Sequence, residues 1–173
     1  MPLFPRLSGA CALLLVLLAP CAALAEPSAI YLVRHAEKAA EGKDPDLTPQ
    51  GRQRAQNIAA MLARTGIAHV FSTPTKRTRQ SAQPLAQATG STVQLYDPKT
   101  PQALVAQVKT LSRPVLVVGH SNTLSELVRL FGGEPGTDIA DNEYDRLYQI
   151  IPGRDATVTT VLLTSLPASG TAP

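Results

Sequence analysis

The sequence predicts an α/β domain, a three-layer sandwich with a mainly parallel sheet. Short apolar segments alternate with stretches of helical spacing between residues 29 and 131, which is the pattern of parallel strands joined by crossover helices. The segment 115–118, Val-Leu-Val-Val, is apolar throughout and mostly β-branched. Such a segment is expected as a central strand that is covered on both faces.

The first 25 residues have the pattern of a secretory signal peptide. Arg6 supplies a positive n-region, residues 11–18 an apolar h-region, and residues 23–25, Ala-Leu-Ala, a small-residue cleavage site. This h-region is shorter than the roughly 20 apolar residues that a membrane span needs. We therefore expect residues 1–25 to be removed on export to the periplasm or the medium. An uncleaved anchor and a lipid attached at Cys21 are the alternatives.

The composition excludes several classes of protein. Cys11 and Cys21 both lie in the predicted signal peptide, so the mature chain offers neither a disulfide, nor a thiolate nucleophile, nor a Cys-ligated metal. Arg6 is the only basic residue of the first 25, so 15 of the 16 Lys and Arg remain against 13 Asp and Glu. This balance gives no reason to expect nucleic acid as a partner. We also expect no stable membrane anchor after cleavage, and no oligomeric state is predicted.

The first elements are a strand over 29–33 and a helix that follows a charged loop over 39–47. Thr48 is a hydroxyl N-cap and Pro49 is suited to the first helical position, so the helix is expected to begin there. Gly66 is expected to be its C-cap.

The second helix is expected over 75–88, after a strand over 68–71, and Gly90 should stop it. Pro84 lies inside this helix and predicts a kink or a break. A short strand over 93–96 follows.

Five more elements and a polar tail complete the expected domain, 26–166. They are a helix over 100–111, a strand over 115–118, a helix ended by Gly132 and Gly133, and closing strands over 147–151 and 158–163. Residues 134–142 are expected to form a loop. The small, polar tail, 167–173, is expected to be disordered.

Three polar clusters follow expected strands. They are Arg34 with His35, residues 72–77, and residues 120–122. Because ligands of open α/β sheets bind at the carboxyl ends of the strands, we expect the three clusters to meet in one crevice.

The predicted crevice suits a tetrahedral dianion. Arginines, drawn from Arg34, Arg77 and Arg79, can bind phosphate oxygens through two parallel hydrogen bonds. Neighbouring positive charge should lower the pKa of one histidine and keep it neutral and nucleophilic. We expect His35 to attack phosphorus and His120, as an imidazolium, to donate to the oxygens that gain charge.

Zinc bound by the two histidines and Glu37 is the rival chemistry. Several arginines in the same pocket would repel a cation, so no metal or other cofactor is expected. The chain also lacks the glycine-rich nucleotide motifs and the G-x-S-x-G motif of serine hydrolases.

Four segments resemble, in order and spacing, the motifs of the histidine phosphatase superfamily, the phosphoglycerate-mutase-like fold. They are R-H-A-E at 34–37, L-T-P-Q-G at 47–51, S-T-P-T-K-R-T-R-Q-S-A at 72–82 and V-G-H-S-N at 118–122. The resemblance implies that His35 accepts the phosphoryl group and that Arg34, Arg77 and His120 form the phosphate pocket. Asn122 either adds a donor to this pocket or caps a helix.

The general acid is the weak point of the resemblance. Asp97 is the one carboxylate between Arg77 and His120, and it is either the proton donor to the leaving group or a turn residue. We expect a histidine acid phosphatase-type hydrolase acting on small phosphorylated substrates, phosphomonoesters or phosphoramidates. A non-catalytic phosphate-binding module and a mutase or phosphotransferase are the alternatives. A mutase needs insertions that shield its intermediate from water, and the spacing here leaves no room for them.

Overall fold

The computed structural model describes residues 26–153 and 155–168. The predicted signal peptide, 1–25, lies outside the described residues. The elements in chain order are β1 (Ile30–Arg34), α1 (Pro49–Leu62), β2 (His69–Ser72), α2 (Lys76–Thr89), β3 (Val93–Leu95), α3 (Pro101–Lys109), β4 (Val115–Gly119), α4 (Ser121–Leu130), β5 (Arg146–Pro152) and β6 (Val158–Thr164).

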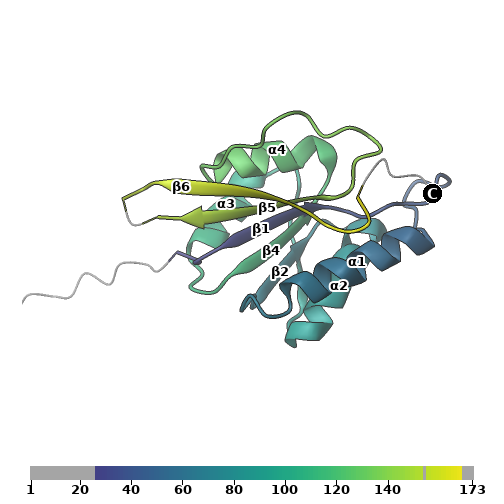
Figure 1. The fold of residues 1–173 in the computed structure, drawn as a ribbon, viewed down its shortest axis with the longest axis horizontal. Helices are drawn as coiled ribbons and strands as arrows, with labels where there is room; N and C mark the ends of the chain where they lie inside the picture. Colours follow the sequence, from purple (N-terminus) through teal and green to yellow (C-terminus); the bar gives the residue numbers. More distant parts are fainter. Residues whose placement is uncertain (1–25, 154, 169–173) are drawn as a thin grey trace, which may run out of the picture.

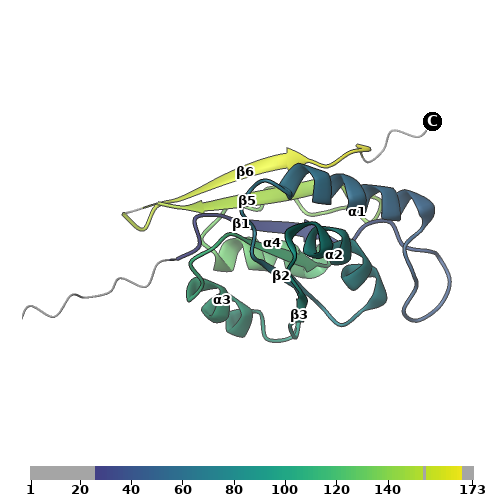
Figure 2. The ribbon, with the colours of Figure 1, turned by 90° about the horizontal axis from the view of Figure 1, so that it is seen from below.

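The strands form one sheet in the order β3-β2-β4-β1-β5-β6. β3, β2, β4 and β1 are parallel to one another, and β5 and β6 are antiparallel. Helices α1 and α2 lie on one face of the sheet, and α3 and α4 lie on the other (Figures 1 and 2). The predicted three-layer sandwich with a mainly parallel sheet is confirmed.

The two central strands, β1 and β4, bury side chains on both faces. Ile30 and Leu32 of β1 pack in the cluster on the α3 and α4 side, while Tyr31 and Val33 pack in the cluster on the α1 and α2 side. β4 alternates in the same way, and all five of its residues are buried. Burial on both faces explains why the sequence of β4 shows no polar alternation.

One predicted helix end is wrong, and a break allowed for in a second helix does not occur. α1 ends at Leu62 with Ala63 as its C-cap, and Gly66 lies beyond it with a φ of +79°. α2 continues through Pro84 to Thr89 without a break. The packing of its inner face, which buries Ser81, Ala82 and Leu85, stabilises this helix, and the hydrogen bond that Pro84 removes is one to exposed Gln80.

The start of α1 is fixed to the segment that follows β1. The Thr48 hydroxyl accepts a hydrogen bond from the Gly51 amide at 3.0 Å, which confirms the predicted N-cap. The Thr48 amide in turn donates to the Glu37 carbonyl at 2.9 Å. A Cβ atom on Gly51 would lie 2.2 Å from the Glu37 carbonyl oxygen. α1 can therefore approach the 34–37 segment this closely only because residue 51 is glycine.

The strand register brings the three polar clusters to one edge of the sheet. Arg34 of β1 is level with Gly119 of β4, and Ser72 of β2 is level with Val118 of β4. The ladder continues one residue further, because the His35 amide donates to the Gly119 carbonyl at 2.9 Å. The residues that follow these strand ends, His35, Thr73 and His120, therefore leave the sheet side by side.

The chain after β6 returns to α1. Arg54 Nη1 donates to the carbonyl oxygens of Ser165 at 2.8 Å and of Pro167 at 2.6 Å. Pro167 begins the tail that the sequence predicts to be disordered, and residues 169–173 of that tail lie outside the described residues. None of the helices within the described ranges has the length and apolarity required to cross a membrane.

Candidate active site

His35 directly follows β1 and is only 3% exposed. Its Nδ1 lies 2.8 Å from the Ala36 carbonyl oxygen. Because a carbonyl oxygen only accepts, Nδ1 must carry the hydrogen. The lone pair of the neutral imidazole is therefore on Nε2, which is the atom that can act as a nucleophile.

The backbone beside His35 is held by α2. The Ala36 amide donates to the Ser81 hydroxyl at 2.9 Å, and this hydroxyl donates to the Arg77 carbonyl at 2.8 Å. Ser81 thus links the segment of the first histidine to the helix turn that presents Arg77. The relative position of these two side chains is set by buried contacts rather than by a mobile loop.

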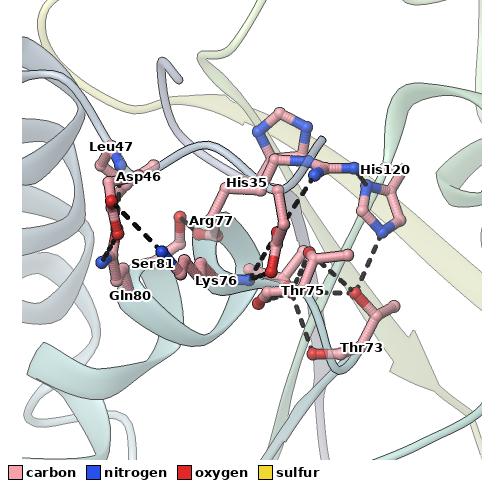
Figure 3. Close-up of polar contacts among 12 residues, drawn as sticks. His35, Asp46, Leu47, Thr73, Thr75, Lys76, Arg77, Gln80, Ser81 and His120 are labelled. Atoms are coloured by element: carbon pink, nitrogen blue, oxygen red, sulfur yellow. Dashed lines mark hydrogen bonds and ion pairs between the residues drawn. The ribbon is translucent and has the colours of Figure 1, made fainter. Parts of the chain in front are cut away.

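His120 lies at the N-cap of α4, and its ring is 5.4 Å from the ring of His35, edge to face. Figure 3 shows it between Arg77 and Thr73. Arg77 Nη2 lies 3.5 Å from His120 Nδ1, and the Thr73 hydroxyl lies 3.0 Å from His120 Nε2. Because a guanidinium only donates, Nδ1 accepts and Nε2 carries the hydrogen in the neutral ring.

The neighbouring threonines are compatible with this tautomer of His120. The Thr78 hydroxyl can donate to the carbonyls of Thr73 and Thr75, at 3.0 and 2.9 Å. It then accepts from the Thr73 hydroxyl, 2.8 Å away. The Thr73 hydroxyl is left to accept from His120 Nε2. The direction of donation thus runs from the imidazole through two hydroxyls to the main chain.

Both imidazoles are neutral at pH 7. Burial, with smaller contributions from Arg34 and Arg77, lowers the pKa of His35 to about 3 and the pKa of His120 to about 4. The predicted effect of neighbouring positive charge is present, but desolvation is the larger cause. The predicted imidazolium at His120 is therefore not the ground state. A bound dianion would raise its pKa by opposing the same charges.

Arg34 is 5% exposed and is held in place by the loop between α4 and β5. Its Nη1 donates to the carbonyls of Ala140 and Glu143, both at 2.8 Å. Its guanidinium carbon lies 4.2 Å from the centre of the Tyr144 ring, which also lies 6.0 Å from the His35 ring. Burial lowers the pKa of Arg34, and Arg77 is close enough to lower it further. Arg34 still remains charged.

Two buried nitrogens in the described part of the chain have no hydrogen-bond partner, Arg34 Nε and Arg77 Nε. Leaving a buried donor unpaired costs about 1–3 kcal/mol. Both belong to the two guanidiniums that influence the pKa of His35 and His120. A tetrahedral oxyanion bound beside the histidines would offset these two positive charges.

Residues 30–98 match the family model of the histidine phosphatase superfamily (branch 1). The chain is 33% identical over 106 residues to a protein named probable phosphoglycerate mutase GpmB from Escherichia fergusonii, an alignment that covers 57% of this chain and 49% of that protein. The chain thus spans about half the length of the curated relatives it matches.

Solved structures share the fold. SixA from Agrobacterium tumefaciens, provisionally named a phosphohistidine phosphatase, has a TM-score of 0.63 and 24% identity, covering 80% of this chain and 99% of that one. Phosphoserine phosphatase from Entamoeba histolytica, in complex with 3-phosphoglyceric acid, has a TM-score of 0.60 and 16% identity, covering 80% and 98%. The sequence matches support the histidine phosphatase superfamily, and the solved structures show that the fold is shared.

The structure brings together four of the residues that the superfamily resemblance selected, Arg34, His35, Arg77 and His120. In the described part of the chain, no hydrogen bond or ion pair joins Asp97 to this group; it is exposed, and its carboxylate accepts from the Lys99 amide at 2.9 Å. This hydrogen bond is that of an Asx turn, the second of the two predicted alternatives.

Two further candidate residues, Asn122 and Arg79, have exposed side chains. The N-cap of α4 is His120, so the predicted capping role of Asn122 is wrong, because the helix begins one residue before it. Asn122 is exposed and lines a hollow beside Asp138 and Ile139. Arg79, the third candidate arginine, is exposed on α2, two residues from Arg77 and therefore on another side of the helix.

Sequence reasoning missed Arg54, Tyr144 and Arg146. Arg54 is fully buried and donates from Nε and Nη2 to both carboxylate oxygens of Glu37, at 2.6–3.1 Å. It lies on the buried stripe of α1 beside Ala55, and a charged residue on an apolar stripe is a signal that could have found it. Tyr144 and Arg146 gave no such signal.

The Glu37 carboxylate is occupied by the Arg54 guanidinium. Across residues 26–153 and 155–168, no three His, Cys, Asp or Glu side chains are grouped so that they could hold a metal ion.

Proposed function

We propose that this chain is an exported, metal-independent phosphatase that hydrolyses phosphomonoesters or phosphoramidates through a phosphohistidine at His35. The observation that carries the proposal is the free lone pair of His35 Nε2 beside two buried guanidinium donors without a partner. The superfamily match and the phosphatases that share the fold support phosphatase activity in general. The signal-peptide pattern of residues 1–25 supports export to the periplasm or the medium.

In the first step, His35 Nε2 attacks phosphorus and the bond to the leaving group breaks. The electron pair of that bond departs with the leaving group. Arg34 and Arg77 donate to the equatorial oxygens, where charge is distributed in the transition state. The approaching dianion raises the pKa of His120, which can then take up a proton and donate to the same oxygens.

In the second step, water attacks the phosphohistidine. The N–P bond breaks, its electron pair returns to His35 Nε2, and inorganic phosphate is released. The Nδ1 hydrogen bond to Ala36 persists through both steps, because Nδ1 keeps its hydrogen throughout. The imidazole therefore needs no change of tautomer between the two steps.

The substrate class follows from the position of Asp97. Its carboxylate is engaged with the Lys99 amide, so the proposal assigns it no proton transfer. Aryl phosphates and phosphoramidates fit this site best, because the first release a stabilised phenolate and the second, already protonated on nitrogen, release a neutral amine. Alkyl phosphates require a proton at the departing oxygen.

Rapid quenching tests the proposal. The mature protein is mixed with a radiolabelled aryl phosphate in the presence of a chelator and quenched in base. We expect turnover with acid-labile, base-stable label on the wild-type chain, and neither label nor turnover for His35→Ala. Turnover without label on the protein would overturn the phosphohistidine. Tight vanadate binding without turnover of any substrate would favour the non-catalytic module, and transfer to an added alcohol would favour a phosphotransferase.

A further inference from the structure

Arg34 is anchored by main-chain atoms of one loop, residues 134–145, between α4 and β5. The carbonyls of Ala140 and Glu143 both accept from Nη1 at 2.8 Å. Tyr144, in the same loop, covers the face of the guanidinium at 4.2 Å. With Nη1 held in this way, Nε and Nη2 are the nitrogens left to bind an anion. The position of the loop therefore sets the direction of the donors.

This loop contains no helix or strand, and the hydrogen bonds of Arg146 hold it in place. Arg146 is the first residue of β5. Its guanidinium donates to the Thr137 carbonyl at 2.6 Å, to the Thr137 hydroxyl at 3.0 Å and to the Asp138 carbonyl at 3.1 Å. It also donates to both oxygens of the Glu143 carboxylate, from Nε to one oxygen and from Nη2 to the other, the second at 3.0 Å. Its Nη1 lies 3.2 Å from the Tyr148 hydroxyl, which accepts from it.

Two further contacts close the network. The Glu143 carboxylate, held by Arg146, accepts from the Ala140 amide at 3.2 Å. The buried Tyr148 hydroxyl donates to the Pro135 carbonyl at 2.8 Å. Arg146 and Glu143 thus fix both residues whose carbonyls hold Arg34. We call this set of contacts the Arg146 clamp.

We propose that Arg146 is a positioning residue that sets the oxyanion affinity of the site through Arg34. The proposal rests on the proposed function only in taking the oxyanion to be the substrate phosphoryl group. Arg146 donates to the loop, and the loop carbonyls accept from Arg34. The clamp therefore adds no charge-assisted donor to the anion but fixes the direction of those that Arg34 offers.

Three variants test the clamp, and orthophosphate is the probe. Arg146→Met removes every donor while keeping the alkyl stem, and Arg146→Lys can satisfy only part of the acceptor set. Arg113→Met is the matched control. Arg113 is exposed just before β4, at the end of the sheet opposite the histidines, and its guanidinium donates to the Gly66 carbonyl at 3.3 Å.

Calorimetry measures orthophosphate binding. We expect Arg146→Met to raise Kd about tenfold, short of the roughly hundredfold effect that an ångström of misplacement can cause. Arg146→Lys should give a smaller rise, and Arg113→Met should bind as the wild type does. Arg146→Met binding orthophosphate as tightly as the wild type would overturn the proposal.

A second measurement reports on Arg34 itself. Its Nε–H resonance, assigned with Arg34→Lys, should show an ordered guanidinium in the wild type and a mobile one in Arg146→Met. A merely structural role for Arg146 would leave this signal unchanged in a variant that remains folded. If Arg146→Met does not fold, Glu143→Gln and Arg146→Lys decide by the same two criteria.

Failure of the proposed function would look different. A wild-type protein that neither binds orthophosphate nor hydrolyses esters would contradict the proposed phosphatase. The order of the Arg34 Nε–H group would still show whether Arg146 positions it, and an unchanged signal in all clamp variants would overturn the clamp.

Discussion

At the scale of single residues, the site is defined by hydrogens and lone pairs rather than by net charge. His35 keeps its hydrogen on Nδ1 because only the Ala36 carbonyl faces that atom at 2.8 Å. His120 keeps its hydrogen on Nε2 because Arg77 faces Nδ1. Two neutral imidazoles with opposite tautomers thus lie side by side. One offers a nucleophilic lone pair, and the other can become a donor after an anion binds.

The lowered pKa values predict an acid-sensitive fold. The pKa of His35 is about 3 and that of His120 about 4 in the folded chain, against 6.5 for a free imidazole. Between pH 6.5 and these values the unfolded chain binds more protons, so the free energy of unfolding falls as pH falls. For His35 we expect a loss of about 1–2 kcal/mol at about pH 5, and for the more exposed His120 a smaller one.

Calorimetric melting from neutral pH downward measures this loss. His35→Asn removes the titrating group, and we expect its melting temperature to depend less on pH than that of the wild type. Added orthophosphate binds the folded state and should restore part of the lost stability. Equal pH dependence in the variant and the wild type would contradict the burial argument.

Asp97 provides a second test at the residue scale. If its carboxylate serves only the turn with the Lys99 amide, Asp97→Asn keeps an acceptor there and should leave kcat/KM unchanged for aryl and alkyl phosphates alike. A general acid would behave differently: the variant would lose activity on alkyl phosphates and keep it on aryl phosphates. Steady-state kinetics with one substrate of each kind distinguishes the two roles.

At the scale of elements, α1 holds the segment that carries His35. Thr48 and Pro49 predict the start of this helix from the sequence, and in the structure the helix begins at Pro49 with Thr48 as its N-cap. The closeness of the approach was not predictable, because it depends on the path of residues 34–37 in space. It is visible in Gly51, where a Cβ atom would lie 2.2 Å from the Glu37 carbonyl.

Gly51→Ala should therefore push α1 away from the 34–37 segment. We expect a loss of about 1–3 kcal/mol in the free energy of unfolding, as for other overpacked positions, together with weaker orthophosphate binding. Gln50→Ala, at the exposed neighbouring position, is the control and should stay within about 0.5 kcal/mol of the wild type. Urea unfolding measures both variants, and equal stability would contradict the close approach.

Pro84 shows that a local sequence rule can predict a feature that the packed helix does not have. The sequence rule for proline inside a helix predicts a kink or a break, and the break does not occur, because α2 continues to Thr89. Local rules describe an isolated helix, whereas α2 is held by its packed face, with Ala82, Leu85 and Ala86 all buried against the sheet. Tertiary contacts of this kind are not contained in a window of sequence.

At the scale of the whole molecule, the convergence of the histidines was predictable because it follows from topology. Parallel strands place their carboxyl ends at one edge, and β1, β2 and β4 do so here. The support of Arg34 was not predictable. It comes from main-chain carbonyls of residues 140 and 143, and a carbonyl is the same in every residue. Only the path of the loop, which Arg146 fixes, gives these two their role.

Arg54 joins the segment after β1 to the segment after β6. Its guanidinium holds Glu37 on one side and the carbonyls of Ser165 and Pro167 on the other. Expression tags or truncations placed directly after β6 would therefore displace or remove acceptors of the guanidinium that holds Glu37, two residues from His35. A recombinant protein shortened at this position would lose acceptors of a buried cation that pairs with Glu37, so a lack of activity in it would not by itself show that the wrong substrate had been chosen.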